Sequence, residues 1–311
     1  MKQKKSPRPS DYISSLNING LEGRMLKIKA KKLKETEILF VYGHHSTLER
    51  WWGLIQVLTN YGNVTVPDLP GFGGMDSFYK ISKKPTIDNY ADYLATFITL
   101  QYQKKKIVIV GLSFGFVVVT RMLQRHPNLT SKVTLLISIV GFAHKDDFIF
   151  SKTRYYSYLL TSRFFSNYIF SKFFRYVILS SPVIRLAYAK TYNAKHKFAG
   201  IEDVIIHNQI IDFEIELWHS NDLRTWMYTT NEFLKLDNCK IRVKLPVWHV
   251  MVSKDNYFNN SLVEQHMRII FSNYNGVTSN AENHAPSIIA DEHMAQYMVP
   301  LKLKRILSKL E

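Results

Sequence analysis

The sequence contains a single cysteine, Cys239, among its 311 residues. An intramolecular disulfide needs two cysteines and a cysteine-based zinc site needs several, so both are excluded. Long apolar runs are lacking as well: the apolar, uncharged run at residues 107–120 is shorter than the roughly 20 residues that a membrane-spanning helix needs. Residues 1–15 are polar and basic and lack the apolar stretch of a secretory signal. We therefore expect a cytoplasmic protein.

Acidic residues are scarce too: 25 Asp and Glu stand against 41 Lys and Arg, which gives a formal net charge of +16. Half of this excess, +8, lies between His144 and Gly200, a stretch rich in Phe and Tyr. No helix-turn-helix, zinc-finger or RNA-recognition motif accompanies it, so we expect no nucleic-acid partner. A solvated basic face is the simplest interpretation, and weak peripheral association with anionic membrane surfaces is the alternative. The sequence leaves the oligomeric state open.

Short apolar segments alternate with segments of helical spacing along most of the chain. This alternation predicts an α/β fold, with a doubly wound, mostly parallel sheet that is covered on both faces. A small hairpin is expected within residues 16–29. Further strands are expected at 38–42, 64–66, 107–110, 133–140, 247–252 and 268–271, and helices at 48–58, 86–100, 114–123, 222–236 and 287–310.

The alternation stops after Ala143. Residues 144–220 keep a helical spacing of apolar residues and carry many aromatic side chains, but they contain no convincing strand. We therefore expect a helical cap at 144–220, inserted into a core made of residues 11–143 and 221–311. Residues 1–10, with four basic side chains and two prolines, are expected to be a disordered tail.

One predicted strand runs directly into the motif Gly111-Leu112-Ser113-Phe114-Gly115, and an apolar helical segment follows. A serine at such a joint between strand and helix is in the setting of a nucleophile. The tight turn is expected to bring the residues two before and two after the serine together, so that a Cβ at Gly111 or Gly115 would clash. The turn also directs the hydroxyl toward the positive end of the next helix.

A nucleophilic serine needs a base that takes its proton and an acid that orients the base. In a doubly wound sheet these groups belong in loops beyond the carboxyl ends of later strands. Asp255 follows the predicted strand 247–252, and His284 lies between the last predicted strand and the last helix. An ordinary surface carboxylate and an exposed loop histidine are the alternatives for these two residues. Their chain order and loop positions favour the catalytic interpretation.

The oxyanion that forms when a serine attacks a carbonyl needs two backbone N–H donors. Phe114, at the start of the helix after the serine, supplies one in this hypothesis. The loop after the strand that ends at Tyr42 supplies the other, with His44 as the first choice and His45 as the fallback. These two histidines are expected to act through their backbone rather than their rings. Because no further ligand cluster accompanies them, we expect neither a metal nor a cofactor.

Taken together, these motifs resemble the α/β-hydrolase superfamily, over essentially the whole chain from about Asp11. The matching segments occur in the family's order and are Phe40–His44 with Trp51, Asp68–Gly73, Gly111–Gly115, Asp255 and His284. The resemblance implies a catalytic triad of Ser113, His284 and Asp255. The serine argues against the haloalkane dehalogenases and epoxide hydrolases of the superfamily, which use aspartate at this position.

The resemblance also implies a reaction class, hydrolysis of carboxylic esters or lactones through an acyl-enzyme. Acyl-homoserine lactones are among the candidate substrates, and the aromatic cap favours uncharged, apolar ones. Carbon–carbon bond hydrolysis by the same triad is one alternative, although Ala285 stands where such relatives tend to carry tryptophan. A non-catalytic protein of this fold that docks on anionic membranes is another. Asp68 and the Pro-Gly-Phe-Gly segment after it are expected to form a structural turn.

Overall fold

The computed structural model describes residues 7–190, 204–281, 284 and 292–310. Eight strands form one sheet in the order β1-β2-β4-β3-β5-β6-β7-β8, and all neighbours from β4 to β8 are parallel. The first two strands are antiparallel to their neighbours and form the predicted hairpin. The strands are β1 (Ile13–Ile18), β2 (Leu21–Ile28), β3 (Glu37–Val41), β4 (Asn63–Pro67), β5 (Ile107–Leu112), β6 (Val133–Ile139), β7 (Val243–Val252) and β8 (Phe271–Ser279).

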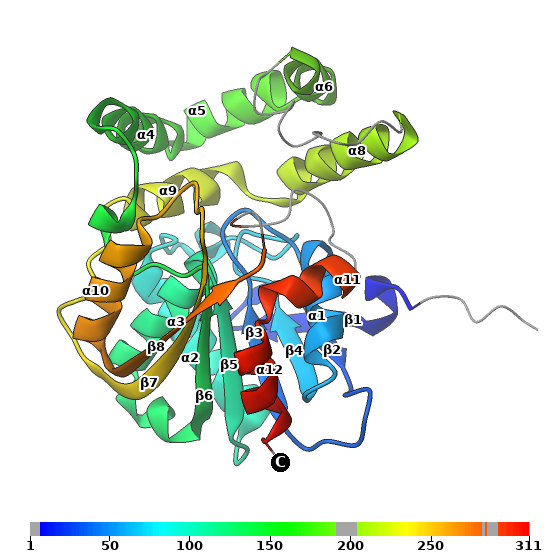
Figure 1. Cartoon of the computed structure of the whole chain (residues 1–311). Helices are drawn as coiled ribbons and strands as arrows, with labels where there is room; N and C mark the ends of the chain where they lie inside the picture. The colour runs from blue at the N-terminus through cyan, green and yellow to red at the C-terminus, as the bar shows by residue number, and fades with distance from the viewer. Residues whose placement is uncertain (1–6, 191–203, 282–283, 285–291, 311) are drawn as a thin grey trace, which may run out of the picture.

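Helices cover both faces of this sheet, which confirms the predicted α/β architecture. In Figure 1, α1, α11 and α12 lie on one face, and α2 and α3 on the other. Helix α2 begins where the sequence predicts, because the side chain of its N-cap residue, Thr86, accepts a hydrogen bond from the Asn89 N–H. The helices of the core are α1 (Trp52–Leu58), α2 (Ile87–Tyr102), α3 (Phe114–Arg125), α9 (Leu223–Phe233), α10 (Asn260–Ile270), α11 (Glu292–Ala295) and α12 (Leu301–Ser308).

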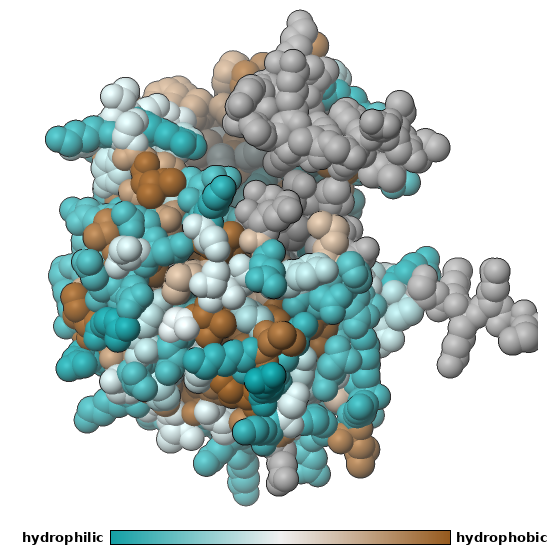
Figure 2. Space-filling view, viewed as in Figure 1, coloured by the Kyte–Doolittle hydropathy of each residue, from teal (hydrophilic) through white to brown (hydrophobic). Residues whose placement is uncertain are grey.

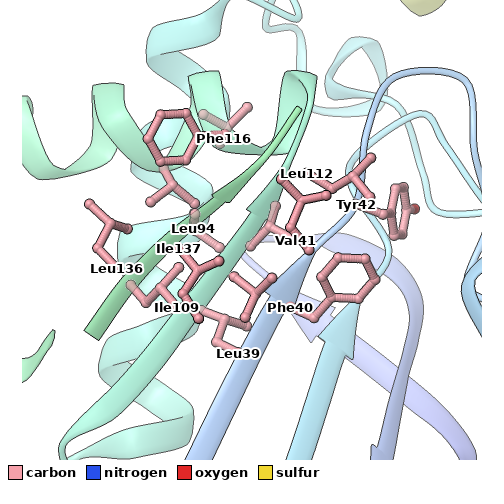
Figure 3. Packing of buried hydrophobic residues seen from close by; sticks show 14 of the residues in the cluster. Leu39, Phe40, Val41, Tyr42, Leu94, Ile109, Leu112, Phe116, Leu136 and Ile137 are labelled. Atoms are coloured by element: carbon pink, nitrogen blue, oxygen red, sulfur yellow. The ribbon is translucent and has the colours of Figure 1, made fainter. Parts of the chain in front are cut away.

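The central strands are buried on both faces, as their unbroken apolar sequences predict. Every residue of β5 is buried, and only the first residue of β3 is not. Figure 3 shows Leu39, Ile109 and Ile137 from three neighbouring strands packed together, with Phe116 of α3 beside them. This packing holds the carboxyl end of β5 in a fixed position, and the Gly-x-Ser-x-Gly motif begins there.

Two predictions at the C-terminal end of the sequence are wrong. Residues 268–270 end helix α10, and the last strand begins only at Phe271 and runs to Ser279. The apolar run Ile269–Phe271 spans the junction of the two elements, and such a short run fits either a strand or a helix. The expected helix at 287–310 is interrupted, because Pro300 starts a new helix, α12, after a 3-10 turn. Residues 285–291 lie outside the described residues.

A layer of helices lies over the carboxyl end of the sheet (Figure 1). Its helices are α4 (Lys152–Phe165), α5 (Tyr168–Phe173), a π-helix (Phe174–Ile178), α6 (Ser181–Lys190) and α8 (Val204–Ser220). Polar contacts tie it to α9: the Arg224 guanidinium donates to the Ser166 carbonyl (3.0 Å), and the Asn231 amide donates to the Leu159 carbonyl (3.2 Å). This arrangement is consistent with the expected insertion. None of the described helices is long and apolar enough to cross a membrane.

The start of the chain is more ordered than the expected tail. Residues 1–6 lie outside the described residues, but Pro9–Tyr12 forms a 3-10 helix whose first turn is closed by a hydrogen bond from the Arg8 N–H to Asp11 (3.0 Å). Asp68 has the contacts of a structural residue: its buried carboxylate accepts hydrogen bonds from the Arg24 guanidinium (2.9 Å) and the Tyr42 hydroxyl (2.7 Å). These contacts fix the turn after β4.

His249 in β7 is buried in the core and pairs with the Ser138 hydroxyl at 2.9 Å. Burial lowers its pKa from the usual value of 6.5 to about 3. Between about pH 3 and pH 6.5, His249 binds a proton in the unfolded chain but not in the folded chain. The stability that this group contributes is therefore complete above pH 6.5 and is lost as the pH falls toward 3, by up to about 1.4 kcal/mol per pH unit.

We therefore expect His249→Asn to flatten the acid side of the stability profile. Urea unfolding at a series of pH values between 4 and 7 measures how the free energy of unfolding depends on pH. The number of protons bound on unfolding, which sets this slope, should fall by close to one in the variant. Replacing the exposed His293 with Gln provides the matched control and should leave the slope within error of the wild type. An unchanged slope in His249→Asn would mean that this histidine is already protonated in the folded protein at these pH values.

Candidate active site

Ser113 lies between the end of β5 and the first residue of α3, and it has a strained backbone. Its φ of 49° and ψ of −120° are rarely adopted by residues with a side chain. The Ser113 N–H donates to the Ile139 carbonyl at the end of β6 (2.9 Å), which holds the turn against the neighbouring strand. The side chain is partly exposed at the carboxyl edge of the sheet, above the buried strand.

The two glycines of the motif are required sterically, but for a different reason from the one that the sequence suggests. The atoms nearest to a Cβ added at either position belong to other residues than the second glycine. A Cβ on Gly111 would lie 2.7 Å from the Cα of Phe116, and a Cβ on Gly115 would overlap the carbonyl oxygens of Val41 and Tyr42. Gly115 therefore allows α3 to approach the end of β3, which places the loop after β3 beside Ser113.

The structure brings together the three residues that the sequence singles out as a triad. His284 Nε2 lies 3.1 Å from Ser113 Oγ, and His284 Nδ1 lies 2.7 Å from Asp255 Oδ2. Asp255 is three residues past the end of β7, and His284 is five residues past the end of β8. Ser113, at the end of β5, meets them because parallel strands have their carboxyl ends at one edge of a sheet.

Asp255 is held as a carboxylate. Burial alone would raise its pKa, but the hydrogen bond and charge of His284 oppose burial, as do the N–H groups of Tyr257 (2.8 Å) and Phe258 (3.2 Å) that donate to Oδ1. The net effect lowers the pKa of Asp255 below its usual value. In this arrangement an ionised Asp255 can accept the Nδ1–H of His284, with Nε2 directed at the Ser113 hydroxyl.

Aromatic rings fix the orientation of His284. The rings of Tyr257 and Phe258 lie 5.1 and 5.2 Å from its imidazole, centroid to centroid. Both belong to the loop whose N–H groups bind Asp255, so one short segment positions the acid and packs against the base. Sequence reasoning missed this role, because residues 257–258 form no motif.

The loop after β3 reaches Ser113, as the sequence predicts for the second oxyanion donor. A Cβ on Gly43 would lie 3.2 Å from the Ser113 Cβ, so this backbone has approached as closely as a glycine allows. Among the described residues, neither the His44 N–H nor the Phe114 N–H donates a hydrogen bond. His45 follows in the left-handed region, with φ of 52°.

The ring of His44 has a structural contact that sequence reasoning did not foresee. Its Nε2 lies 2.6 Å from the Thr229 hydroxyl of α9, and aromatic rings surround it, with Phe233 the nearest at 5.1 Å. Desolvation by this packing lowers the pKa of His44 to about 3, so the ring is neutral at physiological pH. The Thr229 hydroxyl also lies 2.8 Å from the Thr225 carbonyl, so this side chain joins the loop after β3 to the backbone of α9.

The family model described as alpha/beta hydrolase fold matches residues 37–180, which contain β3, the loop after it and the strained serine. The sheet order and the position of Ser113 agree with that match. This chain has the α/β-hydrolase fold.

Solved structures with this α/β-hydrolase fold share little sequence with the chain. A thermophilic esterase from Thermogutta terrifontis has a TM-score of 0.63 and 17% identity, and the match covers 96% of this chain and 98% of the esterase. An N-acyl homoserine lactonase has the same TM-score at 14% identity, with 96% and 98% covered. An enol-lactonase from Burkholderia xenovorans LB400 has a TM-score of 0.62 at 12% identity, with 94% and 99% covered.

At such low identities these likenesses establish the fold alone. Comparison with functionally curated proteins gives no significant match. Within the described residues, no group of three or more His, Cys, Asp or Glu side chains is arranged to hold a metal ion.

Proposed function

We propose that this α/β-hydrolase-fold protein hydrolyses carboxylic esters or lactones, with Ser113 as the nucleophile. The proposal rests on one observation, the continuous chain of hydrogen bonds from Ser113 Oγ to His284 and from His284 to Asp255. A serine paired with a histidine that a carboxylate orients is the arrangement that activates a hydroxyl for attack on a carbonyl. A protein that only binds ligands has no need for this arrangement at a strained turn.

In the first half-reaction, His284 Nε2 takes the hydroxyl proton as Ser113 Oγ attacks the carbonyl carbon. The His44 and Phe114 N–H groups donate to the oxyanion that develops, and Asp255 stabilises the imidazolium. The imidazolium then gives its proton to the departing alkoxide, and the carbon–oxygen bond of the ester breaks. An acyl group remains on Ser113.

In the second half-reaction, water replaces the alcohol. His284 Nε2 removes a proton from the water as its oxygen attacks the acyl carbon, and the oxyanion forms against the same two N–H groups. The bond between the acyl carbon and Ser113 Oγ then breaks, and the imidazolium returns the proton to Oγ. The products are the free carboxylic acid and the original enzyme, so the cycle needs neither metal nor cofactor.

The surroundings of the site favour uncharged, apolar substrates. Among the described rings that pack against His44 and His284, those of Trp226, Phe233 and Tyr257 are at least partly exposed. An acyl chain or a lactone ring gains free energy by leaving water for such surroundings, whereas a charged acyl group loses its hydration. An esterase and two lactonases share this fold, which supports ester or lactone hydrolysis here.

We assign residues 144–220 to a cap over a core made of residues 11–143 and 221–311. Helix α9 of the core contacts the outer helices through Arg224 and Asn231, and it contacts the site through Thr229. Movement of the helices outside α9 would therefore displace the loop that carries His44. The lone cysteine supports a reducing, cytoplasmic location.

A substrate panel tests the reaction class. We expect the protein to hydrolyse nitrophenyl esters and lactones, including an acyl-homoserine lactone, and to leave a dienone substrate of carbon–carbon bond hydrolases intact. A series of acyl lengths then measures the size of the acyl site through kcat/KM. Cleavage of the dienone alone would assign the triad to carbon–carbon bond hydrolysis, and no turnover of any member would contradict the proposed function.

A further inference from the structure

Three consecutive helical segments, α4, α5 and the π-helix, form the outermost layer of the molecule (Figure 1) and bury very little of their surface. Only Ser162 is buried among the 14 residues of α4, only Ser171 in α5, and no residue of the π-helix Phe174–Ile178. A helix of a soluble protein normally buries an apolar stripe against its own core. These segments instead leave most of their apolar side chains exposed, although Phe165 and Phe174 pack against a small buried cluster.

Exposed large hydrophobic side chains are concentrated in this layer. Of the 22 found among the described residues, 11 lie in α4, α5 and the π-helix. Leu160 is 71% exposed, Ile169 72% and Phe173 60%. Figure 2 shows hydrophobic atoms at the outer edge of the same layer, next to hydrophilic ones. Single exposed apolar residues need no explanation, but a contiguous group marks an interaction surface.

The spacing of these residues places them in stripes rather than scattering them. Tyr156, Leu160 and Phe164 are four residues apart along α4, and Ile169 and Phe173 have the same separation in α5. Residues four apart lie on one face of a helix. The rings of Phe164 and Phe170 stack with centroids 3.9 Å apart, which joins the stripe of α4 to that of α5. We call the exposed residues of α4, α5 and the π-helix the outer face.

The outer face is also strongly basic. Residues 151–190 contain seven Lys and Arg and no Asp or Glu. Lys152, Arg154, Arg163 and Lys172 are all exposed, and within the described part of the chain none of the four pairs with a carboxylate. Lys172 instead lies over the ring of Tyr168, 4.4 Å from its centroid. Cations therefore flank the apolar stripes without compensation from neighbouring acids.

We propose that the outer face docks on an anionic lipid bilayer, with its aromatic and aliphatic side chains in the headgroup region and its cations on lipid phosphates. Helices that carry Lys and Arg beside Phe, Tyr and Leu lie in such interfaces, and Tyr rings suit a boundary that is apolar on one side and wet on the other. The absence of acidic residues decides against a second copy of the chain as the occupant, because two such faces would bring like charges together.

Vesicle co-sedimentation tests this docking with the full-length protein. We expect binding to phosphatidylcholine vesicles that contain a quarter phosphatidylglycerol to be at least about 10-fold tighter than binding to phosphatidylcholine alone, since each interfacial cation adds to the attraction. Raising the salt should weaken this preference, because ions screen the charges. The same protein with Ser113→Ala should bind equally well, so the outcome is independent of the proposed hydrolysis.

Two variants separate the apolar contribution from the ionic one. The double variant Ile169→Ser, Phe173→Ser should lose about 10-fold in binding to the anionic vesicles. The double variant Arg163→Glu, Lys172→Glu should lose the preference for anionic lipid. Leu33→Ser is the control, because Leu33 is fully exposed and belongs to the loop between β2 and β3, which lies far from α4 and α5 (Figure 1). Its binding should equal that of the wild type.

The proposal is overturned if the wild type does not bind anionic vesicles at low salt, or if both double variants bind as the wild type does. Sedimentation velocity without lipid tests the alternative, that the outer face binds a second copy of the chain. A dimer that the Ile169→Ser, Phe173→Ser variant abolishes, together with an absence of vesicle binding, would show that the outer face binds a second copy of the chain.

Discussion

Replacing Ser113 with alanine is expected to lower kcat for a short nitrophenyl ester by about 10⁶-fold, the order of magnitude that removal of a triad serine costs. Alanine cannot form the acyl-enzyme, and the N–H groups of His44 and Phe114 would retain only the small residual catalysis that oxyanion binding gives. Stability should change little, because the only side-chain hydrogen bond found for Ser113 among the described residues is the one to His284. Initial rates and thermal unfolding on the same preparation measure both quantities.

The matched control for this variant is Ser131→Ala, an exposed serine in the turn before β6. Its turnover should equal that of the wild type. Retention of more than about a hundredth of the wild-type kcat by Ser113→Ala would mean that the hydrolysis does not pass through this serine.

Replacing Gly115 with alanine is expected to damage both stability and activity. The new Cβ would overlap the carbonyl oxygens of Val41 and Tyr42, which are backbone atoms at the end of a buried strand and cannot rotate away. Either α3 or the end of β3 must shift, and overpacking of this kind costs about 2–4 kcal/mol. The melting temperature should fall by about 5 °C or more.

The same shift would separate Ser113 from the loop that carries His44. We therefore expect kcat of Gly115→Ala to fall by at least about 10-fold in the molecules that remain folded, because small displacements of catalytic groups are costly. Gly276→Ala in β8 is the control, since its Cβ would meet only movable side-chain atoms of Met251 and Tyr274. Equal melting temperatures for Gly115→Ala and the wild type would contradict the packing described here.

Much of the fold could be predicted because its signals are local. The apolar runs of β3 and β5 are long enough to specify buried strands, and the N-cap of α2 at Thr86 is a short-range hydrogen bond. The boundary between α10 and β8 could not be predicted, since the apolar run that spans it suits both structures. Local patterns specify an element more reliably than its end.

Some features of the site could likewise be predicted from local patterns, and others could not. The closeness of Ser113, Asp255 and His284 could be predicted because the first two follow recognisable strands and the third lies in a late loop, and the fold brings these strand ends to one edge. The bond between His44 and Thr229 could not be found, because 185 residues separate them and Thr229 belongs to no motif. The steric role of Gly115 was expected, but its contact with β3 depends on tertiary packing that no local pattern encodes.

The most direct test of the central claim, that His284 activates Ser113 as a nucleophile, is labelling with a fluorophosphonate followed by mass spectrometry. An activated serine reacts, and an ordinary hydroxyl does not. The account predicts one adduct per chain, located on Ser113 and absent from both Ser113→Ala and His284→Ala. An unlabelled wild type, or an adduct that forms at the same rate in His284→Ala, would contradict it.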